Sequence, residues 1–338
     1  MAGNAEQRYA NTALLSVIAV DAPEVVTSAA FDERLMPTYD RLGLRPGMLE
    51  NLAGILQRRW WPPDVSFTDA AAMAGAKALA ESGVDPGRVG LLIDSSVCRT
   101  NLEPSAAVSI HHELGLPTSC LNFDLANACL GFVNGMQLAA TLIDAGQIDY
   151  ALVVDGEGSR ATQEATLDRL CRDDATAADL AAQFATLTLG SGGAAAVLGR
   201  ADTHPEGHRL VRSISRAATE HHDLCVGSIT EMRTDTRALL TGGLTCASDL
   251  WQGSEHDWQD MSMYVAHQIS SVHTKMMCEL LKIDESRMPL TFPTRGNIGP
   301  ASVPFTLAMN QAALTPGDRV LLMGVGSGIN AMATEIVW

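Results

Sequence analysis

Short apolar runs alternate along the chain with segments that have helical periodicity. The runs at residues 12–20, 89–96 and 150–155 are mainly apolar and lack the polar alternation of a strand with one face in water. Strands of this kind are covered on both faces by helices. The pattern therefore predicts a layered α/β protein.

Helices are predicted between and after these strands. Thr68 is expected to cap an Ala-rich helix that stops before Gly83, because Thr favours the first position of a helix and Gly the position after its end. The other predicted helices are residues 28–34, 105–114, 130–145, 261–281 and 301–312, and the other predicted strands are 121–125, 210–216, 290–292 and 319–325.

Three segments depart from this alternation. The stretch 58–63, which is rich in Arg and Trp and ends in two Pro residues, is expected to be a loop. The polar stretch 163–179 is expected to be a surface flap, and residues 186–198 are expected to form two strands around a Gly-rich turn. Residues 204–208 look like a boundary, after which similar element types follow again.

Charge and cysteine usage exclude several classes of protein. The 338 residues carry a formal net charge of −16, which is unsuited to binding a phosphate backbone, so no nucleic acid is expected. The seven Cys form no CxxC pair, which favours free thiols in a reducing compartment. With no signal-like N-terminus and no long apolar run, we expect a soluble cytoplasmic protein without stable membrane insertion.

Cys129 has the most informative surroundings of these thiols. It follows the predicted strand 121–125 and opens the predicted helix 130–145, which is apolar nearly all round and therefore buried. The start of a helix presents free N–H groups and a partial positive charge, which lowers the pKa of a thiol. From this context Cys129 is either a nucleophile or a small buried core residue.

His267 and Asn297 indicate a catalytic role only when they are considered together with Cys129. Each alone has an ordinary alternative, a packed His and a turn Asn next to Gly. Together they have a chemical logic, because a thiolate can attack a thioester while His and Asn donate hydrogen bonds to the enolate oxygen of a second thioester.

Four ordered motifs resemble the ketosynthase III branch of the thiolase superfamily. They are the stretch 124–132 around Cys129, Ala266-His267-Gln268, Gly296-Asn297, and the Gly-rich stretch 324–328. The resemblance covers nearly the whole chain. It implies a five-layer αβαβα thiolase fold with two pseudo-symmetric halves, 1–204 carrying Cys129 and Glu103, and 205–338 carrying His267 and Asn297. It also implies a homodimer.

Within this branch the sequence most resembles OleA-type enzymes of long-chain olefin biosynthesis, which join two acyl-CoAs. The resemblance rests on Glu103, which precedes Pro104 and Ser105 where typical ketosynthases III have an apolar residue. It implies that this Glu reaches the partner's active site. An enzyme that does not decarboxylate its donor must remove an α-proton, so it needs a base. The ordinary alternative is an acid favoured in the first turn of a helix.

Other candidate residues have weaker support. Gly326 and Ser327 could contribute backbone N–H groups to an oxyanion hole. Arg58, Arg59 and Trp60 could bind CoA through phosphate pairing and adenine stacking, or could simply be packed Arg and Trp residues. No metal site is expected, because the pairs 111–112 and 221–222 are adjacent His residues that rarely share one metal.

The expected function is non-decarboxylative Claisen condensation of two long-chain acyl-CoAs to a 2-alkyl-3-oxoalkanoate through acyl-Cys129. Coenzyme A thioesters are the substrates, no cofactor is required, and downstream enzymes of the olefin pathway are possible partners. The main alternative is a decarboxylating 3-oxoacyl-carrier-protein synthase III that uses a malonyl donor. Two others are a non-catalytic partner subunit and a dehydrogenase, the latter resting only on the C-terminal Gly run.

Overall fold

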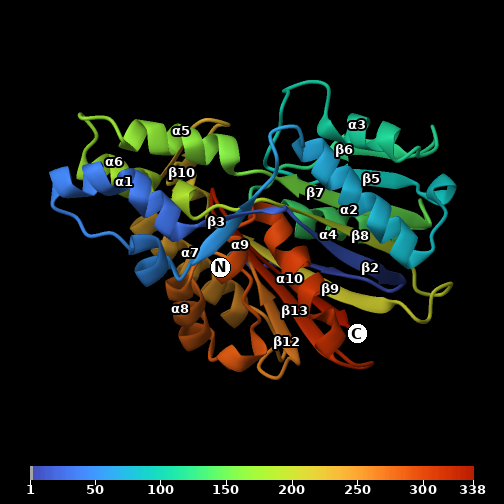
Figure 1. Ribbon diagram of the computed structural model, residues 1–338. Coiled ribbons are helices and arrows are strands. Elements are labelled where there is room, and N and C mark those ends of the chain that lie inside the picture. Colours follow the sequence, from blue (N-terminus) through green and yellow to red (C-terminus); the bar gives the residue numbers. More distant parts are fainter. Residues whose placement is uncertain (1–2) are drawn as a thin grey trace.

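The computed structural model describes residues 3–338, in which ten strands form one connected sheet (Figure 1). The order along the sheet is β12-β13-β14-β9-β2-β8-β7-β5-β6, and β1 pairs with β9. The strands are β1 Ala5–Arg8, β2 Thr12–Asp21, β5 Leu91–Asp94, β6 Leu121–Asp124, β7 Tyr150–Glu157, β8 Gly192–Arg200, β9 His208–Ala217, β12 Met263–Ala266, β13 Arg319–Gly326 and β14 Asn330–Val337.

The two halves of this sheet repeat one pairing pattern. In the first half β5 is parallel to β7, and antiparallel pairs then follow from β7 to β8 and from β8 to β2. In the second half β12 is parallel to β13, and antiparallel pairs follow from β13 to β14 and from β14 to β9. The halves meet where β2 pairs with β9 through two residues, Ala13 and Leu14.

Helices cover the two halves of the sheet and lie between them, so the layers alternate as predicted. The central layer consists of α4 Gly131–Asp144 and α10 Ser302–Asn310. The outer face of the first half is covered by α2 Phe67–Ser82 and α3 Ala106–Glu113. The outer face of the second half is covered by α7 Thr236–Gln252 and α8 Ser271–Leu281. Three apolar clusters fill the spaces between these layers. The predicted five-layer fold is therefore confirmed, and the proposed boundary at 204 falls in the turn between β8 and β9.

A further lobe lies at one side of the molecule (Figure 1). It contains α1 Ser28–Leu42, α5 Arg160–Leu170 and α6 Ala177–Leu187, which share a buried apolar cluster. The short strands β3 Glu24–Thr27 and β4 Gln57–Trp60 pair beside it, and β10 Cys225–Gly227 pairs with β11 Met232–Thr234.

Several local predictions were wrong. Residues 57–60 form strand β4, because the two Pro residues follow the paired segment and do not interrupt it. The expected flap at 163–179 is mostly helical, and Thr176 and Asp179 form a capping box that starts α6. Helix α6 extends to Leu187, so the first of the two strands expected at 186–198 is absent. Ser66, and not Thr68, caps α2.

The second half contains the larger errors. The single helix predicted at 261–281 is strand β12 followed by α8, because Ser270 caps a new helix there. Residues 290–292 are not a strand, since the short helix α9 Phe292–Arg295 begins among them. Helix α7 was missed altogether. Within residues 3–338, no helix combines the length and apolar character needed to cross a bilayer.

Candidate active site

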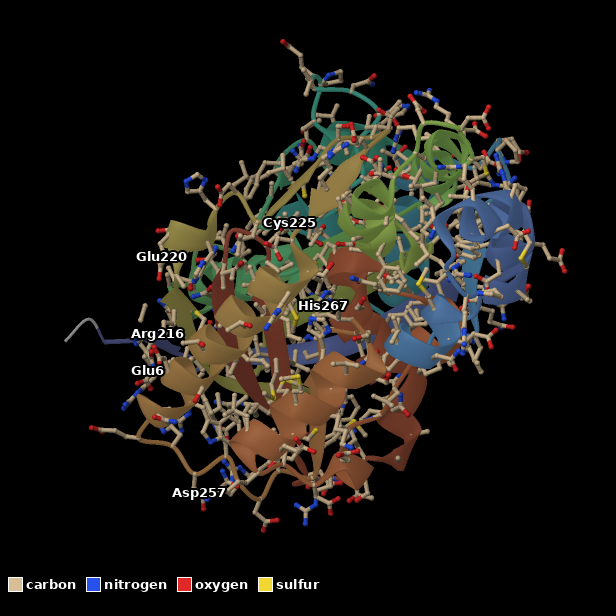
Figure 2. All side chains as sticks on the ribbon, turned by 90° about the vertical axis from the view of Figure 1, so that its left-hand side faces the viewer. Glu6, Arg216, Glu220, Cys225, Asp257 and His267 are labelled. Atoms are coloured by element: carbon tan, nitrogen blue, oxygen red, sulfur yellow. The ribbon has the colours of Figure 1, made fainter. Side chains whose placement is uncertain are left out.

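The predicted catalytic residues meet at one cavity between the two halves. Its volume is about 680 Å³, and Cys129, His267 and Asn297 all contribute to its walls. Figure 2 shows His267 near the centre of the molecule, beneath helices of the C-terminal half. Residues that lie 138 and 30 positions apart in the sequence therefore face one enclosed space, because each follows a strand or turn at the same edge of the layered sheets.

A tight turn presents Cys129 to the cavity. Ala128 has a φ of 45°, in the left-handed region that non-glycine residues rarely adopt, and the Leu130 N–H donates to the Asn127 carbonyl at 3.0 Å. Gly131 then starts α4, and a Cβ there would lie 2.6 Å from the Ser95 carbonyl oxygen. The strained turn is thus held in place by close packing against the end of β5.

The acidity of Cys129 differs from the expectation. Burial raises the pKa of this thiol to about 12, and the nearby Glu157 and Asp155 carboxyls add to the rise. The helix begins two residues after Cys129, at Gly131, so Cys129 lies outside its first turn. The prediction of a thiol with a lowered pKa was therefore wrong, and thiolate formation requires a proton acceptor.

His267 lies at the carboxyl end of β12, held by its backbone. Its N–H donates to the Met323 carbonyl of β13 at 2.8 Å, whereas its side-chain Nδ1 is buried and has no hydrogen-bond partner among residues 3–338. Burial, together with His273, lowers the pKa of His267 to about 3. The ring is therefore neutral at physiological pH and can donate a hydrogen bond without carrying charge.

Asn297 is oriented by its own turn. The side-chain Oδ1 accepts from the Gly299 N–H at 2.9 Å, and the backbone N–H donates to the Thr188 carbonyl at 2.9 Å. With its oxygen engaged, the amide has its NH₂ group left for the cavity. Asn297 and His267 are thus two neutral donors suited to an oxygen atom that becomes negative during a reaction.

The Gly-rich loop packs directly on the nucleophile turn. A Cβ on Gly324 would lie 2.5 Å from the Leu130 side chain, and one on Gly326 would lie 3.2 Å from the Asn127 carbonyl oxygen. Gly326 and Ser327 line the cavity, which agrees with their predicted position beside Cys129. Their role as an oxyanion hole stays a prediction.

Glu103 does not reach the cavity of its own chain. It is exposed, and it is not among the residues that line the cavity, although the preceding residues 96–102 are. Leu102 is fully exposed beside it. The structure of one chain therefore places Glu103 next to the rim of the site and outside its lining.

The expected CoA-binding role of Arg58 was wrong. The side chain is 0% exposed, donates to Ser28 Oγ at 3.1 Å and to the Leu187 carbonyl at 3.0 Å, and lies over the Phe31 ring. Arg58 is a structural residue of the lobe formed by α1, α5 and α6. Trp60 and Arg59 are partly buried and lie outside the cavity lining, so their role stays a prediction.

Three buried carboxyl groups at the strand ends near the cavity escaped prediction. Asp94 ends β5, and Asp155 and Glu157 lie at the end of β7, where all three are at most 5% exposed. Burial raises the pKa of Asp94 to about 6 and that of Glu157 to about 7, and it raises the pKa of Asp155 well above its usual value. The sequence does contain a signal for these carboxyls, because each acidic residue stands at the end of an otherwise apolar strand.

These carboxyls do not form a metal site. Among residues 3–338, no group of three or more His, Cys, Asp or Glu side chains is arranged to hold a metal ion. Two serines contact the group, with Ser95 Oγ donating to Asp155 at 2.6 Å and Ser96 Oγ donating to Asp94 at 2.6 Å.

Comparison with known proteins identifies the family. Residues 123–217 match 3-Oxoacyl-[acyl-carrier-protein (ACP)] synthase III, and residues 252–338 match its C-terminal domain. The chain is 41% identical to the acyl-CoA:acyl-CoA alkyltransferase of Xanthomonas campestris, covering 98% of this chain and 99% of the relative. This chain belongs to the OleA family of thiolase-fold condensing enzymes.

Further comparisons support membership of the OleA family. The alkyltransferase of Shewanella oneidensis is 34% identical over 98% of this chain and 100% of its own. Xanthomonas campestris OleA with bound lauric acid and lauroyl-CoA matches with a TM-score of 0.96 at 40% identity, covering 98% of this chain and all of that one. By contrast, the 3-oxopimeloyl-carrier-protein synthase of Rhodothermus marinus is 28% identical over 89% of this chain and 88% of its own.

Membership of the OleA family indicates the enzyme class as well as the fold. The chain is a thiolase-like acyltransferase, so the predicted enzyme class is confirmed and neither a dehydrogenase nor a decarboxylating synthase is favoured. Solved structures of the Xanthomonas OleA include variants at a cysteine, a glutamate and a histidine. These are three of the four residue types predicted here as catalytic.

Proposed function

We propose that this protein joins two long-chain acyl-CoA molecules by non-decarboxylative Claisen condensation and releases a 2-alkyl-3-oxoalkanoate. The observation that carries the proposal is the convergence of Cys129, His267 and Asn297 on one cavity with largely apolar walls. A nucleophile and two neutral donors fit acyl transfer followed by carbon–carbon bond formation.

The apolar part of the cavity suits fatty acyl chains. It runs along α7 and reaches α8, and the side chains there are mainly aliphatic or thioether groups, namely Leu239, Leu240, Leu244, Leu250 and Met277. Each methylene group removed from water stabilises the complex by about 0.8 kcal/mol. A chain of many methylenes would therefore bind far more tightly than an acetyl group.

The reaction begins with attack of the Cys129 sulfur on the first acyl-CoA, which releases CoA. Glu103 of a second copy of the chain then removes the α-proton of the second acyl-CoA, and His267 and Asn297 donate hydrogen bonds to the resulting enolate oxygen. The enolate carbon attacks the acyl-Cys129 carbonyl and displaces the Cys129 sulfur, which takes up a proton. Water then cleaves the remaining CoA thioester, releasing CoA–SH and the 3-oxo acid. The product would be the starting compound for olefin or hydrocarbon biosynthesis in the cytoplasm, where later enzymes of the pathway are candidate partners.

Exposed apolar groups on the loop that carries Glu103 and on the edge strand β6 support the homodimer that this mechanism requires. Leu102 is fully exposed, Val97 is 54% exposed, and Leu121 on the edge strand β6 is 56% exposed. An edge strand with apolar side chains is a natural site for association with another chain. A second copy placed there would cover the loop that carries Glu103.

A single substrate tests the proposal. The purified protein is incubated with lauroyl-CoA and no malonyl donor, and the products are analysed by mass spectrometry. A condensed product with two acyl chains is expected. Product formation only after addition of malonyl-CoA or a malonyl carrier protein would show that the enzyme decarboxylates its donor and would refute the proposal.

The role of Glu103 can be tested separately. Glu103→Ala should still form acyl-Cys129 but should neither exchange α-hydrogens nor condense two substrates, because only those steps need the base. Mixed dimers of Cys129→Ala and Glu103→Ala chains should recover activity at one of two sites. No recovery in verified mixed dimers would show that Glu103 does not act across an interface.

A further inference from the structure

The protein needs a proton acceptor for its nucleophile, and none of the residues discussed so far can supply it. Burial keeps Cys129 in its thiol form, since its pKa is raised to about 12. His267 is too weak a base, because burial lowers its pKa to about 3. Glu103 is exposed and outside the cavity of its own chain.

Glu157 and Cys129 line the same cavity, close enough for the Glu157 charge to act on the Cys129 thiol. Among residues 3–338, Glu157 is the one carboxylate that lines the cavity, since Asp94 and Asp155 are fully buried and are not part of the lining. Its side chain is 5% exposed, so it faces the enclosed space and not bulk water.

Two contacts fix the position of this carboxyl. The Val97 N–H donates to Glu157 Oε1 at 2.6 Å, which anchors one oxygen to the loop after β5. On the opposite side, a Cβ built on Gly299 would lie 3.4 Å from Glu157 Cδ. The carboxyl therefore sits between this loop and the turn that orients Asn297, and a residue at position 299 larger than Gly would crowd it.

The ionisable groups around Glu157 keep it near the protonation state that a base needs. Asp155 on its own strand, Asp94 from β5, Cys98 from the following loop and Cys129 from the turn before α4 all face it. Burial and the Asp94 charge raise the pKa of Glu157 to about 7, while hydrogen bonds from Cys98 and Val97 oppose the rise. At neutral pH the carboxyl can therefore both accept and return a proton.

We infer that Glu157 is a further catalytic residue, which accepts the Cys129 proton during acylation, a role that rests on the proposed function. As the sulfur–carbonyl bond forms, the thiol proton moves to the Glu157 carboxylate. When the bond to the CoA sulfur breaks, the same proton passes to the departing thiolate and leaves as CoA–SH. Glu157 ends the step as a carboxylate, and Glu103 remains the base for the later removal of the α-proton.

The two possible roles of Glu157 predict effects of opposite sign. The negative charge of Glu157 raises the pKa of the Cys129 thiol. If Glu157 only lies nearby and takes no proton, replacing it with a neutral residue would lower the pKa of Cys129 and make the thiol more reactive. A proton acceptor, once neutralised, would slow the attack. The sign of the change in acylation rate therefore separates them.

The experiment measures formation of acyl-Cys129 from lauroyl-CoA in a single turnover, by rapid quench and mass spectrometry, between pH 5.5 and 9. The wild-type rate should rise with pH to a plateau with an inflection near 7. Glu157→Gln should be slower by a hundredfold or more at pH 7.5 and should lose that inflection. Glu157→Asp should be intermediate and keep it, and Glu81→Gln, which changes an exposed carboxyl on α2, should match the wild type.

An unchanged or faster acylation rate in Glu157→Gln would overturn the inference. If that variant does not fold, as judged by circular dichroism, the wild-type profile decides, because a steady rise up to pH 9 without an inflection near 7 would also overturn the inference. Failure of the proposed function looks different, since the wild type would then acylate with the expected profile but yield no condensed product.

Discussion

The two halves of the protein share a strand order but supply different chemistry. In the first half, the parallel strands β5 and β7 end in Asp94 and Glu157, and the turn before the central helix α4 carries Cys129. In the second half, the equivalent strands β12 and β13 end beside His267 and at Gly326. One half presents groups that hold protons, whereas the other presents neutral hydrogen-bond donors.

This difference shows that the scaffold fixes positions and leaves the chemistry open. The carboxyl ends of matching strands meet at the same cavity in both halves, so four strand ends are available for catalytic groups. Separation of proton-holding groups from neutral donors has a physical advantage. An enolate next to His267 and Asn297 gains hydrogen bonds, whereas next to the carboxyls it would be repelled.

Substitution of Cys129 should have the largest effect on activity, because it removes the nucleophile of the first half. Cys129→Ala should abolish both acyl-enzyme and condensed product, because no other residue can form the covalent intermediate. Intact-protein mass spectrometry after incubation with lauroyl-CoA measures this directly. Cys171→Ala, which changes an exposed cysteine, is the control and should acylate normally. An acylated Cys129→Ala protein would place the nucleophile elsewhere.

Changes in the second half should separate the two chemical steps. His267→Ala and Asn297→Ala should each still acylate Cys129 but lose condensation by a hundredfold or more, about 3 kcal/mol, as expected for loss of one oxyanion donor. Single-turnover acylation and steady-state product formation are measured side by side. Wild-type condensation in either variant would remove that residue from the mechanism.

The contact between the halves should be sensitive to a single methyl group. A Cβ on Gly190 would lie 1.8 Å from the Arg295 carbonyl oxygen, and the Gly190 N–H donates to the Asn297 carbonyl at 2.8 Å. Gly190→Ala should therefore destabilise the protein by about 2 kcal/mol and displace Asn297. Urea unfolding measures the loss, and Gly3→Ala, where no atom lies within 4 Å of the added Cβ, is the control and should leave stability unchanged.

The smallest effect concerns the buried acids of the first half. Burial raises the pKa of Asp155, so the native state holds a proton that the unfolded chain has lost, and this residue makes stability fall as pH rises above about 4. Asp155→Asn should therefore gain stability relative to the wild type as the pH is raised from 5 to 8. Thermal melts at both pH values measure this gain, with exposed Asp174→Asn as control. An equal shift at both pH values would contradict the explanation.

Much of the site could be predicted because its signals are local in the sequence. Cys129 follows a strand and precedes an apolar helix, and the Gly residues at 324 and 326 are needed where the loop packs on Leu130. The layered fold could also be predicted, since its strands are continuous apolar runs. Both depend on short-range patterns and on one family resemblance.

The rest depends on tertiary contacts that periodicity does not contain. Arg58 resembles a surface cation in the sequence, but the strand β4 directs it onto Phe31 in the interior. Helix α7 was missed because three Thr residues and the adjacent Gly242 and Gly243 lie within it, and these residue types disfavour helix. A short apolar run such as β12 does not reveal whether it is strand or helix until its partner β13 is known.

The turn between β8 and β9 offers a practical use. Asp202, Thr203, Pro205 and Glu206 are exposed there, and the chain on either side enters a strand that is paired inside the molecule. Cutting the gene at this turn would yield two polypeptides, one with the thiol and the other with its hydrogen-bond donors. Neither piece would hold a whole active site, so enzymatic turnover would report when the two had found each other.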